Sequence, residues 1–329
     1  MATEILTAWQ EHLSATTLSS VHRTYLSLAL LPMSGCERRA ELTMSDAERL
    51  WDRTFSNLVL DLLRFELSAL EGDPVPLPQA RANASTVSLR CLLALEAAAP
   101  ALWRRSIAVS PFDGASSMQV AREICGQVEA AHSTEERQTL VRSMHPLSAQ
   151  HDEYLFMRSL QILESTFSFI SLALRRTSEG LNSGNAAAAI GGLRSATRTL
   201  LEVEPIFSLL GTVTTGLFRE SRHFSNEARA AQTRGYEVLG TLCRSPGERA
   251  LDALAPEDVP KAKERVLSHR ATLAESFAFA CHTGKLEGAN QERVDAAMTG
   301  LELAVLRWRK AHRKLAVRIL GTQVSSPLC

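Results

Sequence analysis

The sequence predicts an all-α protein in which long amphipathic helices pack as an antiparallel bundle. Apolar residues recur every three or four positions over most of the chain, which is the period of a helix with one buried face. Alternation of apolar and polar residues, the pattern of a half-buried strand, is almost absent. Clusters of glycine, proline, asparagine and serine divide the apolar stretches into segments of helical length. A bundle of this kind can hold a cofactor between facing helices.

The first two predicted helices lie in the N-terminal third of the chain. One follows Asp46 and ends at Gly72, where Gly-Asp-Pro interrupts the apolar pattern. The other covers about residues 85–98 and is expected to end near Pro100, because proline lacks a backbone N–H. The apolar stripe of the first helix consists of Trp51, Phe55, Leu58, Val59, Leu62, Leu63 and Leu67.

A loop rich in serine, glycine and proline, residues 110–117, separates these helices from the rest. We therefore predict an N-terminal helical extension, residues 1–115, and a main helical-bundle domain, residues 116–329. Connections are predicted at residues 179–185 and 245–260. The helices predicted for the main domain cover about residues 152–175, 186–210, 225–243, 262–282 and 293–320, before an irregular tail at 321–329.

Composition excludes several classes of partner and site. Lys plus Arg and Asp plus Glu balance at 36 each, so nothing in the charge favours nucleic acid or an anionic membrane as a partner. The cysteines are scattered without a Cys-x-x-Cys pair, which argues against zinc, iron–sulfur and c-type haem sites. The sequence shows neither a secretory leader pattern nor an apolar run of about 18 residues. We expect a cytoplasmic protein with reduced thiols.

The last predicted helix places a histidine on its apolar face. His312 must be hydrogen-bonded or bound to a metal there. The helix pattern alone favours a hydrogen-bonded core histidine, although a single histidine with space opposite it also suits a five-coordinate haem. The apolar face consists of Leu301, Val305, Trp308, His312, Leu315, Ala316 and Ile319, and the opposite side carries Arg307, Lys310, Lys314 and Arg318.

The segment Trp308-Arg-Lys-Ala-His312 and the helix after it resemble the proximal haem-ligand helix of tryptophan 2,3-dioxygenase. In that family a tryptophan precedes the iron-binding histidine by four residues. The resemblance implies that His312 is the axial ligand of haem b iron and that Trp308 packs beside the cofactor. It also implies a homo-oligomer.

Other motifs of the same superfamily occur upstream in the expected order. His151-Asp-Glu-Tyr-Leu-Phe156 is similar to the family's first substrate-pocket helix, and Phe218-Arg219 with Gln232-x-Arg-x-x-Glu237 is similar to a second segment. The resemblance covers about residues 145–326. It implies that Phe156 packs on the substrate ring and that Arg219 pairs with the α-carboxylate. A guanidinium fork suits that carboxylate.

The predicted substrate pocket departs from the family pattern. Leu160 replaces the family's distal histidine, which contacts the indole nitrogen of tryptophan, and Thr215 replaces a substrate tyrosine. His223 lies four residues after Arg219 and would face the pocket if the segment is helical, as an acid–base residue; an exposed loop histidine is the alternative.

Polar residues at two helix starts have structural alternatives. Ser225 and Asn226 would either cap the next helix or donate hydrogen bonds toward the substrate and oxidant, and the cap is the simpler interpretation. His151 and Asp152 are predicted to have structural roles, with Asp152 as a helix N-cap.

The altered pocket favours the secondary-metabolism branch of the superfamily. Ala316 stands where the covalent-haem methyltyrosine hydroxylases carry a cysteine. We expect a haem-dependent hydroxylase of an aromatic amino acid, tyrosine or a derivative, with peroxide or dioxygen as oxidant. The alternatives are an oxygenase of tryptophan or its derivatives, a non-catalytic haem-binding protein of the same fold, and a helical scaffold without haem.

Overall fold

Every regular element in the described part of the chain is helical, which confirms the predicted all-α class. The computed structural model describes residues 27–33, 41–73, 83–107, 115–145, 150–214 and 271–320. In chain order the elements are η1 (Leu28–Leu30), α3 (Met44–Glu71), α4 (Ala84–Arg104), α5 (Ser117–Ala130), α6 (Thr134–Arg142), α7 (His151–Ser183), α8 (Ala186–Glu202), α9 (Pro205–Leu210), α15 (Leu273–His282) and α16 (Gly288–Leu320).

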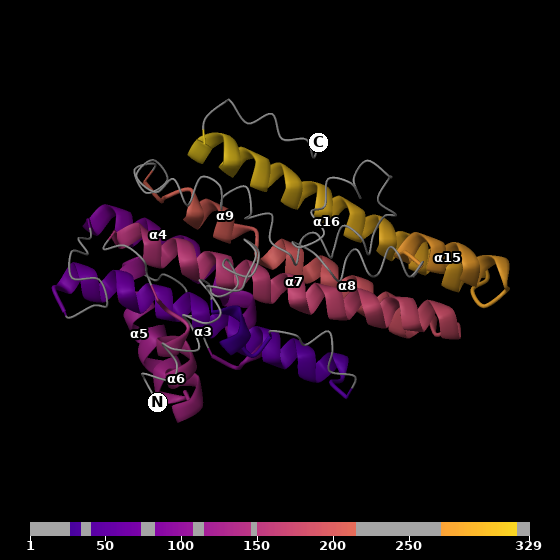
Figure 1. Cartoon of the computed structure of the whole chain (residues 1–329), viewed down its shortest axis with the longest axis horizontal. Coiled ribbons are helices and arrows are strands. Elements are labelled where there is room, and N and C mark those ends of the chain that lie inside the picture. The colour runs from indigo at the N-terminus through magenta and orange to yellow at the C-terminus, as the bar shows by residue number, and fades with distance from the viewer. Residues whose placement is uncertain are drawn as a thin grey trace, which may run out of the picture.

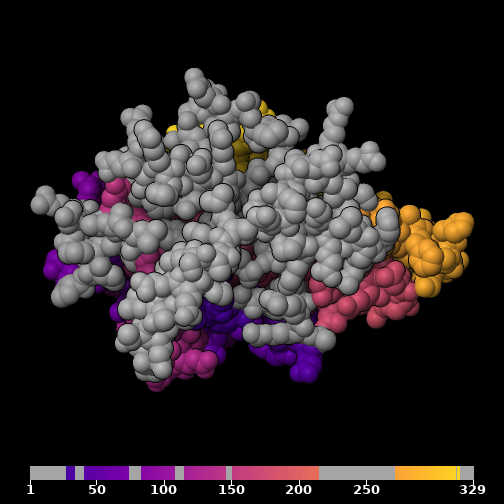
Figure 2. Space-filling view, viewed as in Figure 1, coloured from indigo at the N-terminus to yellow at the C-terminus, as the bar shows by residue number. Residues whose placement is uncertain are grey.

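The long helices form stacked, roughly antiparallel layers (Figure 1). Helix α7 is at the centre and packs against α3 on one side and α8 on the other, and α16 lies along α8. Helix α4 packs against α3 and the short helix α9, while α5 covers the α3–α4 pair. The C-terminal part of α7 and helix α15 lie together at one end of the molecule (Figure 2). This order places α9 between α4 and the C-terminal part of α16.

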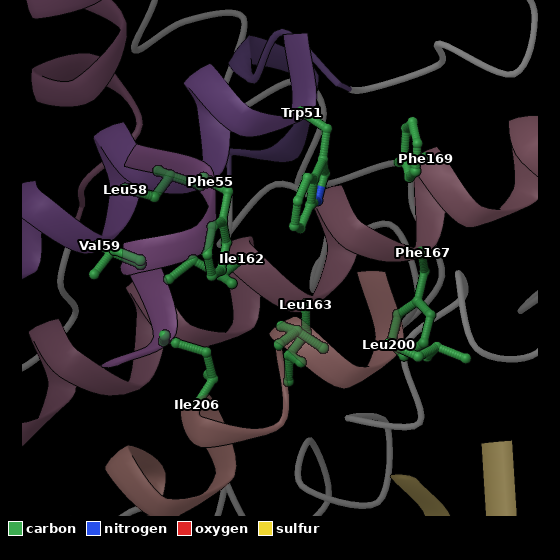
Figure 3. Packing of buried hydrophobic residues seen from close by; sticks show 14 of the residues in the cluster. Trp51, Phe55, Leu58, Val59, Ile162, Leu163, Phe167, Phe169, Leu200 and Ile206 are labelled. Atoms are coloured by element: carbon green, nitrogen blue, oxygen red, sulfur yellow. The ribbon is translucent and has the colours of Figure 1, made fainter. Parts of the chain in front are cut away.

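The core lies between α3, α7 and α8, where aromatic rings interlock (Figure 3). Trp51 of α3 stacks on Phe55, with 5.0 Å between ring centroids, and its ring lies 5.8 Å from that of Phe169 on α7. These are the separations that aromatic pairs favour. The predicted apolar stripe of α3 is buried over its whole length.

Glycine sets the distance between α7 and α8. A Cβ added at Gly192 of α8 would lie 2.4 Å from Thr177 Oγ1 and 2.6 Å from the Ala173 carbonyl oxygen. Both distances are too short for a Cβ atom, so a side chain at this position would force one helix to move. The neighbouring Gly191 has no such contact. Helices α7 and α8 therefore approach more closely at Gly192 than any residue with a side chain would allow.

Helix α4 continues through Pro100 to Arg104, so its predicted end near Pro100 is wrong. The missing N–H would have paired with the carbonyl of Glu96, which lies on the exposed side of α4, where water can replace the proline. Ala101 and Leu102 after the proline are fully buried. Their burial keeps the chain helical for another turn.

Helix α4 is also the one helix in the described ranges that is long and apolar enough to cross a membrane. Half of the window that meets this criterion is buried inside the fold. The buried side packs against α3, α5 and α9.

Helix α7 runs through much of the predicted connection at 179–185 and ends at Ser183. Gly184 takes a left-handed conformation, with φ of 74°, and caps the helix. Gly180 stays inside the helix because its missing side chain admits the backbone of α8: a Cβ there would lie 2.9 Å from the Ala189 nitrogen.

The single helix predicted at 186–210 is two helices, α8 and α9. They are separated by a turn at Val203 and Glu204, and Pro205 is the first residue of α9. Proline lacks the N–H that would continue α8 by bonding to Leu201, and its ring suits the first position of a new helix.

Sequence patterns did not indicate α5 or α6, although Ser133 and Glu136 form a capping box at the start of α6. The predicted helix at 225–243, the first part of that at 262–282 and the tail lie outside the described residues. The division of the chain near residue 115 remains a prediction.

Candidate functional site

Helix α16 presents Trp308 and His312 one turn apart. Leu301, Ala304 and Trp308 are buried, whereas His312 and Leu315 are half-buried. The predicted apolar face therefore packs against α8 in its first part and opens toward its C-terminal part. His312 lies at this transition.

The imidazole of His312 is held by aromatic rings. It stacks on the indole of Trp308, with 5.2 Å between centroids and 6° between planes. Phe207 of α9 lies 6.1 Å from the His312 ring and 5.4 Å from Trp308. The Phe167 ring of α7 makes an edge contact with the indole, with 5.3 Å between centroids. Rings from α7, α9 and α16 thus fix the orientation of the Trp308–His312 pair.

The chemistry of His312 suits a metal ligand. Burial lowers the pKa of this imidazole below its ordinary value, so the ring is neutral at pH 7. Neutral imidazole is the form that coordinates iron. Neither ring nitrogen hydrogen-bonds to a group within the described part of the chain. Whether His312 is a structural histidine or a metal ligand is not decided by these contacts.

No cluster of three or more histidine, cysteine, aspartate or glutamate side chains suited to a metal ion occurs in the described ranges. A haem needs a single protein ligand, because the porphyrin supplies the other nitrogens. The lack of such a cluster therefore neither supports nor opposes a haem on His312, and the haem stays a prediction.

Phe156 and Leu160 are buried on α7, with 7% and 4% of their surface exposed. Their spacing from Phe167 places all of them on one face of α7, about two turns (Leu160) and three turns (Phe156) from it. Because α16 runs antiparallel to α7 (Figure 1), His312 is displaced from Trp308 toward Leu160. Phe156 and Leu160 thus share the α7 face whose Phe167 contacts Trp308, and their role in binding a substrate ring stays a prediction.

The remaining predicted site residues, namely Thr215, Arg219, His223, Ser225 and Asn226, lie outside the described residues. The described segment that precedes them ends at Thr214, which is hydrogen-bonded to α7. The Thr214 N–H donates to Asp152 Oδ2 at 2.7 Å. Asp152 belongs to the first turn of α7, and the N-cap is Gln150, so its predicted role as N-cap is wrong.

Asp152 is held by a buried arginine that sequence analysis did not single out. Arg90 of α4 donates to Asp152 Oδ1 at 2.6 Å, to Glu66 Oε1 at 2.8 Å and to Thr212 Oγ1 at 2.9 Å. Burial raises the pKa of Asp152, but the charge of Arg90 and the Thr214 N–H outweigh it and lower that pKa below its usual value. The carboxylate is therefore ionised at neutral pH.

This network joins α3, α4, α7 and the end of α9. Its signal in the sequence is a charged Arg90 between the apolar Val87, Cys91 and Ala94, on what is otherwise a buried face. A buried arginine must be paired. Phe167 and Phe207, which contact the Trp308–His312 pair, had no signal, because buried phenylalanines are common in any core.

No protein-family model matches the chain, and no curated protein matches its sequence. The resemblance to the tryptophan 2,3-dioxygenase superfamily therefore stays a prediction.

Proposed function

We propose that the protein binds haem b through His312 and hydroxylates the ring of an aromatic amino acid, tyrosine or a derivative. The observation that carries this proposal is the environment of His312: a neutral imidazole, stacked on Trp308 and not hydrogen-bonded within the described residues. A neutral imidazole that forms no hydrogen bond with these residues is free to coordinate an iron.

The protein's own side chains would position the substrate. Phe156 and Leu160 offer an apolar wall for an aromatic ring, since both are buried on the α7 face that includes Phe167. Arg219 would pair with the substrate carboxylate. Haem supplies the activation of the oxidant, and the protein supplies orientation and exclusion of water.

Peroxide is the simpler oxidant. One of its oxygen atoms enters a ring C–H bond and the other leaves as water, so the reaction balances without a further electron donor. Dioxygen would need two electrons and two protons from a reductant to give the same products. Leu160 favours hydroxylation over indole ring opening, because an apolar side chain there offers no partner for an indole N–H.

The test is haem titration followed by absorption spectroscopy. Wild type is expected to give a saturable Soret band, and His312→Ala to lose or shift it. His282→Ala removes an exposed histidine from α15 and serves as the matched control. A wild-type protein without a Soret band, or an unchanged band in His312→Ala, would contradict the proposal.

Product mass then separates the possible activities of the haem-loaded protein. One oxygen atom added to tyrosine supports the hydroxylase. Two atoms added to an indole indicate the tryptophan-type oxygenase instead. A Soret band without turnover of any aromatic amino acid indicates a non-catalytic haem protein.

A further inference from the structure

A cleft of about 550 Å³ separates α9 from the C-terminal part of α16. Its floor is partly apolar, made by Phe207, Ala311 and Leu315, with the Ser208 hydroxyl beside them. Its remaining lining residues are Glu204, Gly211, Arg307, Lys310, Lys314 and Arg318.

The cleft concentrates positive charge in a chain that has no net charge. Arg307 is already paired, at 2.5 Å, with Glu204. Lys310, Lys314 and Arg318 form no ion pair with any residue that the structure describes. No aspartate or glutamate occurs in residues 303–320. The surface that lines the cleft therefore holds cations in excess of its single carboxylate.

Stabilisation of the α16 C-terminus explains only part of this pattern. Cations interact favourably with the negative end of a helix, but the effect falls off within the last turn. Arg318 is close enough to the end of α16 at Leu320 to contribute in this way. Lys310 and Lys314 lie about three and two turns, respectively, before Leu320. The helix dipole therefore does not account for the charges of Lys310 and Lys314 on the cleft.

The cleft borders the proposed haem ligand but does not include it. Lys314 follows His312 by two residues, which turns its side chain by about 200° around the helix axis. Ala311 and Leu315 line the cleft, whereas His312 does not. Phe207 lines the cleft and also lies 6.1 Å from the His312 ring, so a ligand in the cleft would adjoin the imidazole without contacting it directly.

We propose that the α9–α16 cleft is a binding site for a small organic polyanion, a compound with at least two phosphate or carboxylate groups and an apolar part. Lys310, Lys314 and Arg318 contact the anionic groups, and Phe207 and Leu315 contact the apolar part. Lysine and arginine bind phosphate and carboxylate through charge-assisted hydrogen bonds. A concave site with an apolar floor selects a small molecule over an extended polymer.

Calorimetric titration of the full chain with pyrophosphate and with citrate, near neutral pH and at low salt, tests the proposal. We expect saturable binding of at least one probe, and the preferred probe shows whether phosphate or carboxylate is the natural group. Lys310→Gln with Lys314→Gln is expected to weaken binding at least about tenfold. Arg293→Gln with Arg313→Gln is the matched control, because it removes the same charge from exposed positions of α16 outside the cleft.

The control pair is expected to change the dissociation constant less than about twofold, since only general screening is affected. The His312→Ala variant should bind the probes as wild type does, so loss of haem binding and loss of polyanion binding are separate results. Equal weakening in the two double variants would overturn the proposal. So would the absence of saturable binding, or binding of an acidic peptide or oligonucleotide but of neither probe.

Discussion

Arg90 and Lys314 are cations on two sides of α9, and the structure treats them differently. Arg90 is 2% exposed and donates hydrogen bonds to Glu66, Asp152 and Thr212. Lys314 is exposed on the rim of a cleft and forms no ion pair with a described residue. Burial imposes pairing, because an isolated charge in the interior costs several kcal/mol. A buried charge therefore needs a partner in the fold, whereas an exposed charge such as Lys314 remains available to a ligand.

The largest effect is expected from Arg90→Ala. This substitution leaves the carboxylates of Glu66 and Asp152 buried without their cation. Loss of one partner from a buried charge pair costs about 3–5 kcal/mol. Urea denaturation at neutral pH, followed by circular dichroism, measures this change in the free energy of unfolding.

Arg64→Ala provides the contrast on the surface. Arg64 pairs with Glu129 at 2.9 Å, and the two side chains are 50% and 43% exposed. Exposed pairs contribute about 0–1 kcal/mol, so this variant should unfold almost as wild type does. A similar loss in the free energy of unfolding for Arg90→Ala and Arg64→Ala would show that burial does not determine how much a charge pair contributes to stability.

A smaller effect, with opposite signs at adjacent residues, is expected on α8. Gly192→Ala places a methyl group against Thr177 and Ala173 of α7, and such overpacking costs about 1–3 kcal/mol. Gly191→Ala meets no atom within 4 Å and should stabilise the exposed side of the helix by up to about 1 kcal/mol. Thermal melts of the two variants measure the difference. A destabilised Gly191→Ala, or a neutral Gly192→Ala, would contradict the close approach of α7 and α8.

Helical periodicity was sufficient to predict the class and most of the described helices. It was less reliable at their ends, because Pro100 and Gly180 act through tertiary contacts: Ala101 and Leu102 bury the turn after the proline, and Ala189 packs on the glycine. A local pattern contains no information about the neighbouring helix. The break between α8 and α9 could have been predicted, because proline at position 205 ends a helix by a local effect. The extension of α7 could not, because it depends on packing against α8.

Residues of the candidate site could be predicted from the sequence where a polar or charged side chain interrupts an apolar helix face. His312 is a polar side chain on an apolar face, and this contrast identified it before its contacts with Trp308 and Phe207 were known. Arg90 presented the same contrast on α4. The cleft at Lys310 and Lys314 had no such signal in the sequence. Cations are expected on the outer face of a helix whether or not a second helix forms a concave surface with them.

The smallest effect is expected on the pH dependence of stability at His132, a histidine whose pKa is lowered by burial. His132 is 8% exposed, and burial lowers its pKa below the ordinary value of about 6.5, as it does at His312. Between the folded and unfolded pKa values the unfolded chain binds more protons. The free energy of unfolding therefore falls as the pH drops through about 6.5 toward the lower folded value. The His132→Gln variant lacks that titration, so its denaturation midpoint should vary less with pH over this interval than that of wild type. An unchanged pH dependence would show that the interior near His132 admits water, or that the carboxylates of Glu136 and Glu129 offset the effect of burial.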